Sequence, residues 1–299
     1  PSGWPSLDRP EAERGLGLRF HAGELALLAA RTGHGKTSAL AGLLRHWLRD
    51  TLGDELVVFY SLEEPEVRIF HRLAALVTHE IGDPWGANEV RDYLQNPALR
   101  ETWPHIGTLT RALEALRAVE DHLLVVCRPS WRVADLDAHA RSVAARRPVS
   151  AVMVDYLQRL PGDGAFDRRD LEVSAVARCL KTLAGDLNVP VVAGAQINRE
   201  AVKGRDVPRD RPYTDEAVQN AIKARRPKLE HLREGGSEQE ADLVLGLLNY
   251  RADFEEDADN DRPVPDVTDF EIGVLKNRYG APGRWAKLAF EGRYHVLTD

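Results

Sequence analysis

Cysteine is scarce in this sequence, with two residues of that type among 299. Cys127 and Cys179 form neither a disulfide framework nor the paired spacing of a metal site. The sequence therefore excludes a small secreted domain held together by disulfides. We expect both thiols to be reduced, as in cytoplasmic proteins.

Long apolar runs and an excess of positive charge are missing as well. No apolar stretch approaches the length of a membrane span, and the first residues lack the pattern of a signal peptide. We therefore expect a cytoplasmic protein without membrane contact. The formal net charge of −7 argues against a broad basic surface for nucleic acid, but it leaves a local basic groove or channel open.

What the chain does contain is a regular alternation of apolar runs and amphipathic stretches, without internal repeats or a low-complexity linker. This alternation predicts an α/β fold with a mainly parallel central sheet flanked by helices. Three late apolar runs, near 269–276, 285–290 and 293–297, predict antiparallel strands at the C-terminal end. We expect a single domain, 1–299, with an irregular lead-in over 1–22.

Two later segments are predicted to lie outside the regular elements. Residues 199–236 are highly charged and interrupted by prolines, which predicts a long exposed loop with one short helix near 214–224. An acidic loop is expected over 253–266.

The strand expected at 25–30 runs into a glycine turn and then into an apolar pattern at helical spacing. The stretch Ala30–Thr37 matches the phosphate-binding pattern G-x-x-x-x-G-K-S/T, except that alanine stands where the first glycine belongs. A strand–turn–helix unit points backbone N–H groups and the positive end of a helix dipole at one place, which suits a phosphate. Lys36 would reach the β- and γ-phosphates, and the Thr37 hydroxyl would hold Mg²⁺.

We therefore predict that this turn binds the phosphates of a nucleotide, and the alternative is a turn that only reverses the chain. The candidate phosphate-binding residues are Gly33, His34, Gly35, Lys36, Thr37 and Ser38.

Three further strands are expected to end in polar side chains, at Glu63, Asp155 and Gln196. In open parallel sheets, ligands bind at the carboxyl ends of the strands. Asp155 follows four apolar residues, as a Walker-B acid does, and would hold Mg²⁺ directly or through water. The alternative for Asp155 is an acid that caps a turn.

Glu63 is a candidate general base for the water that attacks the nucleotide. The alternative is an acid that stabilises the N-terminus of the next helix. Glu64 competes for the catalytic role, but Glu63 lies closer to the end of the strand.

Seven short motifs follow one another along the chain in a specific combination. They are Ala29–Thr37, Ser61–Glu63, Val154–Gln158, Gln196–Arg199, Leu232–Ser237, Gln239–Asp242 and Lys276–Arg278. Together they resemble the motor domain of DnaB-type replicative helicases, over essentially the whole chain. Alanine at the position of Ala30 is also found in that family, so this departure from the phosphate-binding pattern supports the resemblance.

The resemblance implies a RecA-like P-loop NTPase fold that assembles into a hexameric ring, with ATP bound between neighbouring subunits. By motif match, Lys36 and Thr37 would bind phosphate and Mg²⁺, Glu63 would be the catalytic base and Asp155 the Walker-B acid. Gln196 would sense the γ-phosphate and couple it to DNA.

The motif Lys276–Arg278 has a role in trans in this family. By resemblance, Lys276 and Arg278 would reach into the site of the next subunit, Arg278 as an arginine finger. From the residues alone, the alternative is a solvated pair on an edge strand.

Loops that face the channel contact DNA in this family, and the matching positions here are rich in arginine and glycine. Glycines let backbone N–H groups approach a phosphate closely. The alternative is a charged loop that is only solvated. The candidate DNA-binding residues are Arg168, Arg169, Arg199, Arg233, Glu234, Gly235 and Gly236.

The sequence thus predicts an ATP- and Mg²⁺-dependent motor that moves along single-stranded DNA and unwinds duplex during replication. Its expected partners are single-stranded DNA, further copies of itself and other replication proteins, in the cytoplasm at the nucleoid. One alternative is a RecA-like ATPase that acts as a nucleotide switch, loader or regulator without unwinding. A second, a non-catalytic binding module, is disfavoured because the candidate catalytic residues are all present.

Overall fold

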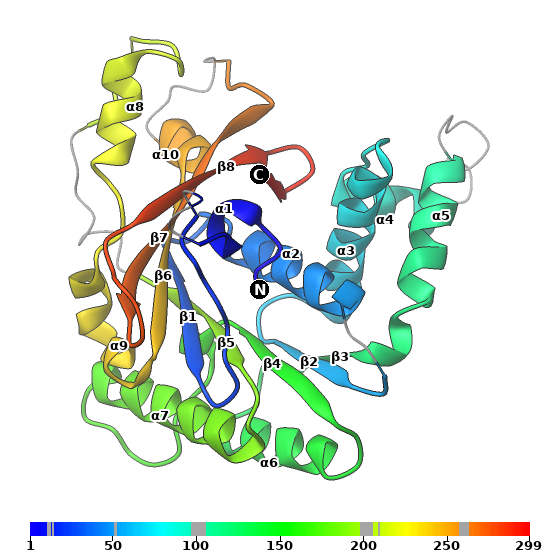
Figure 1. Cartoon of the computed structure of the whole chain (residues 1–299), viewed down its shortest axis with the longest axis vertical. Coiled ribbons are helices and arrows are strands. Elements are labelled where there is room, and N and C mark those ends of the chain that lie inside the picture. The colour runs from blue at the N-terminus through cyan, green and yellow to red at the C-terminus, as the bar shows by residue number, and fades with distance from the viewer. Residues whose placement is uncertain are drawn as a thin grey trace.

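One mixed sheet organises the fold, with strands in the order β3-β2-β4-β5-β1-β6-β7-β8-β9 (Figure 1). The computed structural model describes residues 1–10, 13, 15–50, 53–96, 106–197, 206–208, 210–256 and 263–299, without the side chains of 50 and 233–235. The strands are β1 (Leu25–Ala30), β2 (Leu56–Ser61), β3 (Leu123–Cys127), β4 (Val149–Asp155), β5 (Val191–Gln196), β6 (Leu243–Asn249), β7 (Val267–Asn277), β8 (Trp285–Glu291) and β9 (Val296–Thr298).

The sheet is parallel from β3 to β6 and antiparallel from β6 to β9. β1 lies inside the parallel part, paired with β5 on one side and β6 on the other. The expected fold class, a mainly parallel sheet with antiparallel strands at the C-terminal end, is confirmed. The last strand begins at Val296, three residues later than expected, because Gly292–His295 form the turn that precedes it.

Helices cover both faces of the parallel part, α2 and α3 on one side and α6 and α7 on the other (Figure 1). The α-helices are α1 (Pro5–Asp8), α2 (Lys36–Asp50), α3 (Glu66–Ile81), α4 (Ala87–Gln95), α5 (Ile106–Arg117), α6 (Val133–Ala144), α7 (Arg169–Leu187), α8 (Glu216–Lys223), α9 (Ser237–Glu240) and α10 (Tyr250–Glu256). The 3₁₀ helices are η3 (Glu120–His122), η4 (Leu157–Arg159) and η6 (Leu229–Gly235). Within the described ranges, no helix is both long enough and apolar enough to cross a bilayer.

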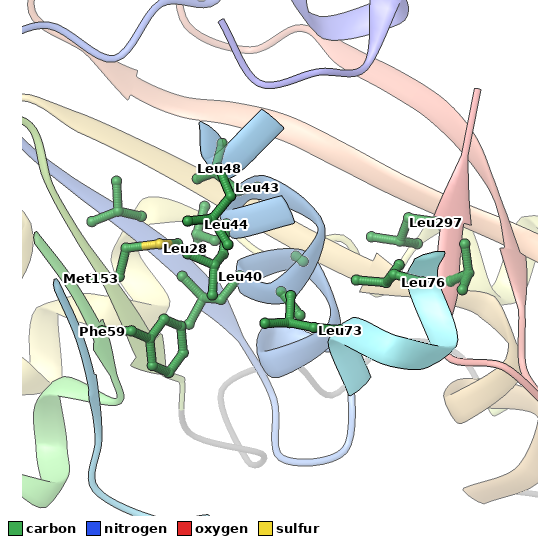
Figure 2. Packing of buried hydrophobic residues seen from close by; sticks show 14 of the residues in the cluster. Leu28, Leu40, Leu43, Leu44, Leu48, Phe59, Leu73, Leu76, Met153 and Leu297 are labelled. Carbon is green, nitrogen blue, oxygen red and sulfur yellow. The ribbon is translucent and has the colours of Figure 1, made fainter. Parts of the chain in front are cut away.

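The strand β1 shows how the two faces are built. Its side chains alternate, so that Leu28 packs in the cluster of α2 and α3, while Leu27 packs in the cluster of α6 and α7. Figure 2 shows Leu28 beside Leu40 and Leu44 of α2, on the side where the helix meets the strands. Each such leucine contributes about 1.5–3 kcal/mol by leaving water. β1 is thereby fixed on both faces, and the turn that follows it has a rigid base.

The described part of 199–236 is not the exposed loop that its charge predicts. Val207, Val218 and Ile222 are buried, and they pack with Phe254 in a third hydrophobic cluster that also contains Tyr213. The short helix expected near 214–224 is present as α8. The expectation of an exposed loop is therefore wrong for the apolar residues of this segment, whereas residues 210–212 are exposed as expected.

The acidic loop expected over 253–266 is also partly wrong. Its first residues complete the helix α10, in which Asp253 and Phe254 are buried. Asp253 is buried because two arginines neutralise its charge. Periodicity cannot show this arrangement.

Candidate active site

The turn between β1 and α2 has the geometry of a phosphate-binding loop. Gly33 and Gly35 adopt φ angles of 79° and 81°, which favour glycine. At Gly35 a side chain would also be crowded, since a Cβ atom would lie 3.0 Å from Cε2 of Phe270. The turn ends at Gly35, and α2 begins at the next residue, Lys36.

Lys36 is folded back onto the turn. Its Nζ donates hydrogen bonds to the carbonyl oxygens of Ala30 at 3.3 Å and Arg31 at 3.2 Å. Burial lowers the pKa of Lys36, although the carboxylates of Asp155 and Glu63 act in the opposite direction. The ammonium group is therefore held at the mouth of the loop, where a phosphate would be bound.

Thr37 and Asp155 come together from α2 and the end of β4. The Thr37 hydroxyl donates a hydrogen bond of 2.8 Å to Oδ2 of Asp155. Oδ1 of Asp155 is buried and has no hydrogen-bond partner among the described residues. Burial raises the pKa of Asp155 to about 6, against the hydrogen bond from Thr37. A hydroxyl beside an unpartnered carboxylate oxygen fits the oxygen ligands that Mg²⁺ prefers.

Glu63 and Glu64, the two competing acids, have different surroundings. Glu64 is held by Arg72 through hydrogen bonds of 3.0 and 2.7 Å. Burial alone would raise the pKa of Glu64, but these bonds and the charge of Arg72 outweigh it and lower the pKa. The Glu63 side chain is about half exposed, at 48%, and its ion pair with Arg159 is 4.0 Å long. Glu63 is therefore the more available of the two carboxylates.

Gln196 ends β5 and is fixed through its backbone. The side chain of Gln158 accepts a hydrogen bond from the Gln196 amide and donates one to the Gln196 carbonyl, both at 2.9 Å. Gln158 belongs to a motif in the sequence, but its positioning contact becomes visible only in the structure.

These side chains surround one cavity of about 230 Å³. Its lining residues are Thr32, Gly33, Gly35, Lys36, Thr37, Ser38, Glu63, Glu64, Arg72, Asp155, Tyr156, Gln196 and His295. The carboxyl ends of β1, β2, β4 and β5 thus meet as expected for neighbouring parallel strands.

Arg72, Tyr156 and His295 also line this cavity, although the sequence did not predict them there. Tyr156 directly follows Asp155, so its place could have been found from the sequence. Arg72 and His295 lie in a helix and a turn without any motif, and only the fold brings them here. His34, by contrast, is not among the lining residues, and its buried ring lies 4.0 Å from Asp253.

Lys276 and Arg278 lie far from this cavity. Arg278 forms a 2.8 Å ion pair with Asp242, which in turn accepts a hydrogen bond from the backbone of Leu25. Leu25 is the first residue of β1, and the phosphate loop follows the last. A strand of six residues spans roughly 20 Å, so Arg278 and Lys36 of one chain lie at opposite ends of the sheet.

The candidate DNA-binding residues are only partly described. Arg199 and the side chains of 233–235 lie outside the described residues. Arg168 and Arg169 are exposed at the start of α7 and pair with Asp170 and Glu172.

Gly236 has a structural reason to be glycine. Its φ of 65° favours glycine, and a Cβ atom would lie 3.0 Å from the Cβ of Ser174 on α7. This reason does not depend on DNA.

The fold and the cavity together define a RecA-like P-loop NTPase. The comparisons with known proteins identify the family. A profile of the DnaB-like helicase C terminal domain matches residues 2–299, and the chain belongs to this family.

Several relatives are similar over the whole chain. Replicative DNA helicase DnaC of Bacillus subtilis is 28% identical over 301 residues, which cover 100% of this chain and 56% of the relative. Replicative DNA helicase DnaB of Geobacillus stearothermophilus is 29% identical over 302 residues, with the same coverage. The chain thus spans a little over half the length of these curated relatives.

Two solved structures share the fold. One is a DnaB-like replicative helicase, described with its interactions with primase, with a TM-score of 0.74 and 26% identity. That match covers 100% of this chain and 62% of the other. The second is an ATPase domain with a TM-score of 0.74 and 25% identity, and the match covers 100% of this chain and 90% of that domain.

Proposed function

We propose that this chain is the ATP-hydrolysing motor of a replicative DNA helicase, which moves along single-stranded DNA and unwinds duplex. The observation that carries the proposal is the convergence of Lys36, the Thr37–Asp155 pair and Glu63 on one cavity. Membership of the DnaB-like family supports the choice of substrate. ATP and Mg²⁺ are the proposed cofactors, because the loop suits phosphates and the pair suits Mg²⁺.

The residues of the loop bind and orient the triphosphate. Backbone amides of the loop would bind the phosphates at the N-terminus of α2, and Lys36 would leave the carbonyls of Ala30 and Arg31 to reach the β- and γ-phosphates. Thr37 and Asp155 would hold the metal ion. When bound, Mg²⁺ neutralises charge that develops on the phosphate oxygens.

Glu63 accepts the proton of the attacking water, since it is the available carboxylate at the end of β2. Gln196, held by Gln158, lies at the end of β5, between β4 and β1, and senses the γ-phosphate. Arg278 completes the site of a neighbouring subunit. Its position supports this role, because it lies about one strand length from the cavity of its own chain and cannot reach it. Lys276 acts beside it.

Single-stranded DNA and other copies of the chain, arranged in a hexameric ring, are the proposed partners, together with further replication proteins. The DNA contacts come from Arg199 and from Arg233–Gly236, with Arg168 and Arg169 nearby. Phosphate contacts of this kind tolerate any sequence. The proposed place of action is the cytoplasm, at the nucleoid.

The test measures ATP hydrolysis with and without single-stranded DNA, and strand displacement on a labelled forked duplex. We expect hydrolysis that DNA stimulates, displacement that requires ATP, and loss of both in Lys36→Ala. Hydrolysis without displacement would favour the alternative of a nucleotide switch over a motor. An absence of hydrolysis under all conditions would contradict the proposal that the chain is an enzyme.

A further inference from the structure

A buried carboxylate lies directly behind the phosphate loop, on an element that does not line the cavity. Asp253 of α10 has a side-chain exposure of 0% and lies between two guanidinium groups. Arg31, the first residue of the turn, contacts Oδ1 of Asp253, and Arg225 approaches the same oxygen at 3.1 Å. Their side chains are 7% and 8% exposed.

Stability alone does not account for this arrangement. Removing charges from water is costly, and a buried ion pair is often no more stabilising than apolar side chains of the same volume. The sequence nevertheless places charges on both sides of the contact between the turn and α10. Arg31 is held a second time, by Glu256 at 3.3 Å.

The contact continues into the catalytic lysine. While the side chain of Arg31 is held by Asp253, its carbonyl oxygen accepts the hydrogen bond from Nζ of Lys36. Gly33 and Gly35 give the rest of the turn a backbone of high intrinsic freedom. Arg31 therefore anchors a loop that is otherwise rich in glycine.

A cation site is a weaker interpretation of the same residues. His34, Asp253 and Glu256 offer ligand atoms within 4.8 Å of one another. However, the guanidinium of Arg31 contacts both carboxylates, so a metal ion would face a fixed positive charge. We therefore interpret Asp253 as the partner of Arg31 and not as a metal ligand.

We propose that Asp253 is a positioning residue of the phosphate loop, which acts through Arg31 and does not touch the nucleotide. By holding the guanidinium it fixes the Arg31 carbonyl, and with it the shape of the turn that receives the phosphates. The inference rests on the proposed binding of ATP. A loop that is already ordered loses less entropy when the ligand binds, so the anchor raises affinity.

The principal variant is Asp253→Asn, which keeps the shape of the side chain and removes its charge. We expect it to weaken nucleotide binding and to raise KM for ATP about tenfold, with kcat within about twofold of the parent. A merely structural role would lower the amount of folded protein without changing KM. Titration with a fluorescent ATP analogue measures affinity directly, and circular dichroism checks the fold.

Arg225→Gln is the matched control, because it removes the other guanidinium from the same carboxylate oxygen. Arg31 still neutralises Asp253 in this variant, so we expect nucleotide affinity within about twofold of the parent. An equal loss of affinity in Arg225→Gln would assign the effect to the buried cluster as a whole and overturn the path through Arg31.

Arg31→Gln tests the path from the other side. We expect the same tenfold loss of affinity, and no further loss when Asp253→Asn is added, because both changes break one contact. If Asp253→Asn does not fold, Arg31→Gln decides, since Arg225 still neutralises the carboxylate. Additive effects of the two substitutions, or an unchanged affinity in Arg31→Gln, would overturn the inference.

Failure of the inference can be told apart from failure of the proposed function. If the parent chain does not bind the ATP analogue, both the proposed function and the inference are wrong. A parent that binds the analogue, together with a folded Asp253→Asn that binds equally well, would overturn the inference alone.

Discussion

Two neighbouring glutamates, alike in sequence, have different surroundings at the edge of the cavity. Arg72 holds Glu64 through two hydrogen bonds, whereas Glu63 is half exposed and its ion pair with Arg159 is as long as 4.0 Å. Proximity to the strand end favours Glu63 in the sequence, and the contact of Glu64 adds an independent reason. A general base must be able to accept a proton from water, and Arg72 opposes this at Glu64.

The corresponding prediction compares two isosteric substitutions. We expect Glu63→Gln to lower kcat for ATP hydrolysis by about a hundredfold, because the amide cannot accept the proton. ATP binding should remain, since the phosphate loop is unchanged. Steady-state kinetics and an ATP-binding titration measure the two effects separately.

Glu64→Gln is the control, and we expect it to keep most of its turnover. Near-normal turnover in Glu63→Gln, together with an inactive Glu64→Gln, would show that the neighbouring acid is the base.

The central residues of this cavity could be predicted because each follows a short apolar strand. Lys36, Asp155 and Gln196 were found in this way, from strand ends that a parallel sheet must bring to one edge. Asp253 could not be found, because its importance depends on two arginines that are distant in sequence. Local patterns carry no information about such contacts.

At the scale of elements, the helices and strands of the parallel part follow from periodicity, and so does α8, but the burial of α8 and its surroundings does not. Charged residues and prolines dominate 206–236, and this composition favours a loop. The apolar spacing of Val218, Ala221 and Ile222 nevertheless fits one helix face. That face packs on Phe254 of α10, a residue that the sequence predicts to lie in an acidic loop.

We therefore predict that the cluster around α8 contributes to the stability of the fold. Ile222 is fully buried there, so Ile222→Ala should lower the free energy of unfolding by about 2–5 kcal/mol. Lys223→Ala, one residue further along and exposed, should stay within about 0.5 kcal/mol of the parent. Denaturant unfolding measures both. Equal, small effects of the two substitutions would mean that α8 is only loosely attached.

At the scale of the whole molecule, the position of Arg278 bears on assembly. Its guanidinium is half exposed at the end of the sheet opposite the phosphate loop, roughly one strand length away. It cannot stabilise charge on a nucleotide bound by its own chain. A role as arginine finger therefore requires a second copy of the chain.

Arg278 can be substituted to test this role without disturbing the core. Asp242 is buried, but Lys181 approaches its other oxygen at 2.7 Å, so the carboxylate keeps a counter-charge when Arg278 is removed. Arg278→Ala should consequently fold normally. Lys287→Ala, which removes an exposed cation on β8, is the matched control.

If Arg278 acts in trans, hydrolysis per chain must rise with protein concentration, because an isolated chain lacks the charge that stabilises the transition state. Arg278→Ala and Lys36→Ala should each be inactive, yet each keeps the half of the site that the other has lost. Mixed oligomers of the two should therefore regain part of the activity, at those junctions where an intact Lys36 meets an intact Arg278. ATPase assays on mixtures whose co-assembly is verified by mass measurement test this directly, and Lys287→Ala should behave as the parent throughout. Verified mixed oligomers without recovery, or an activity per chain that stays constant down to monomeric protein, would remove the arginine finger and the main support for the ring.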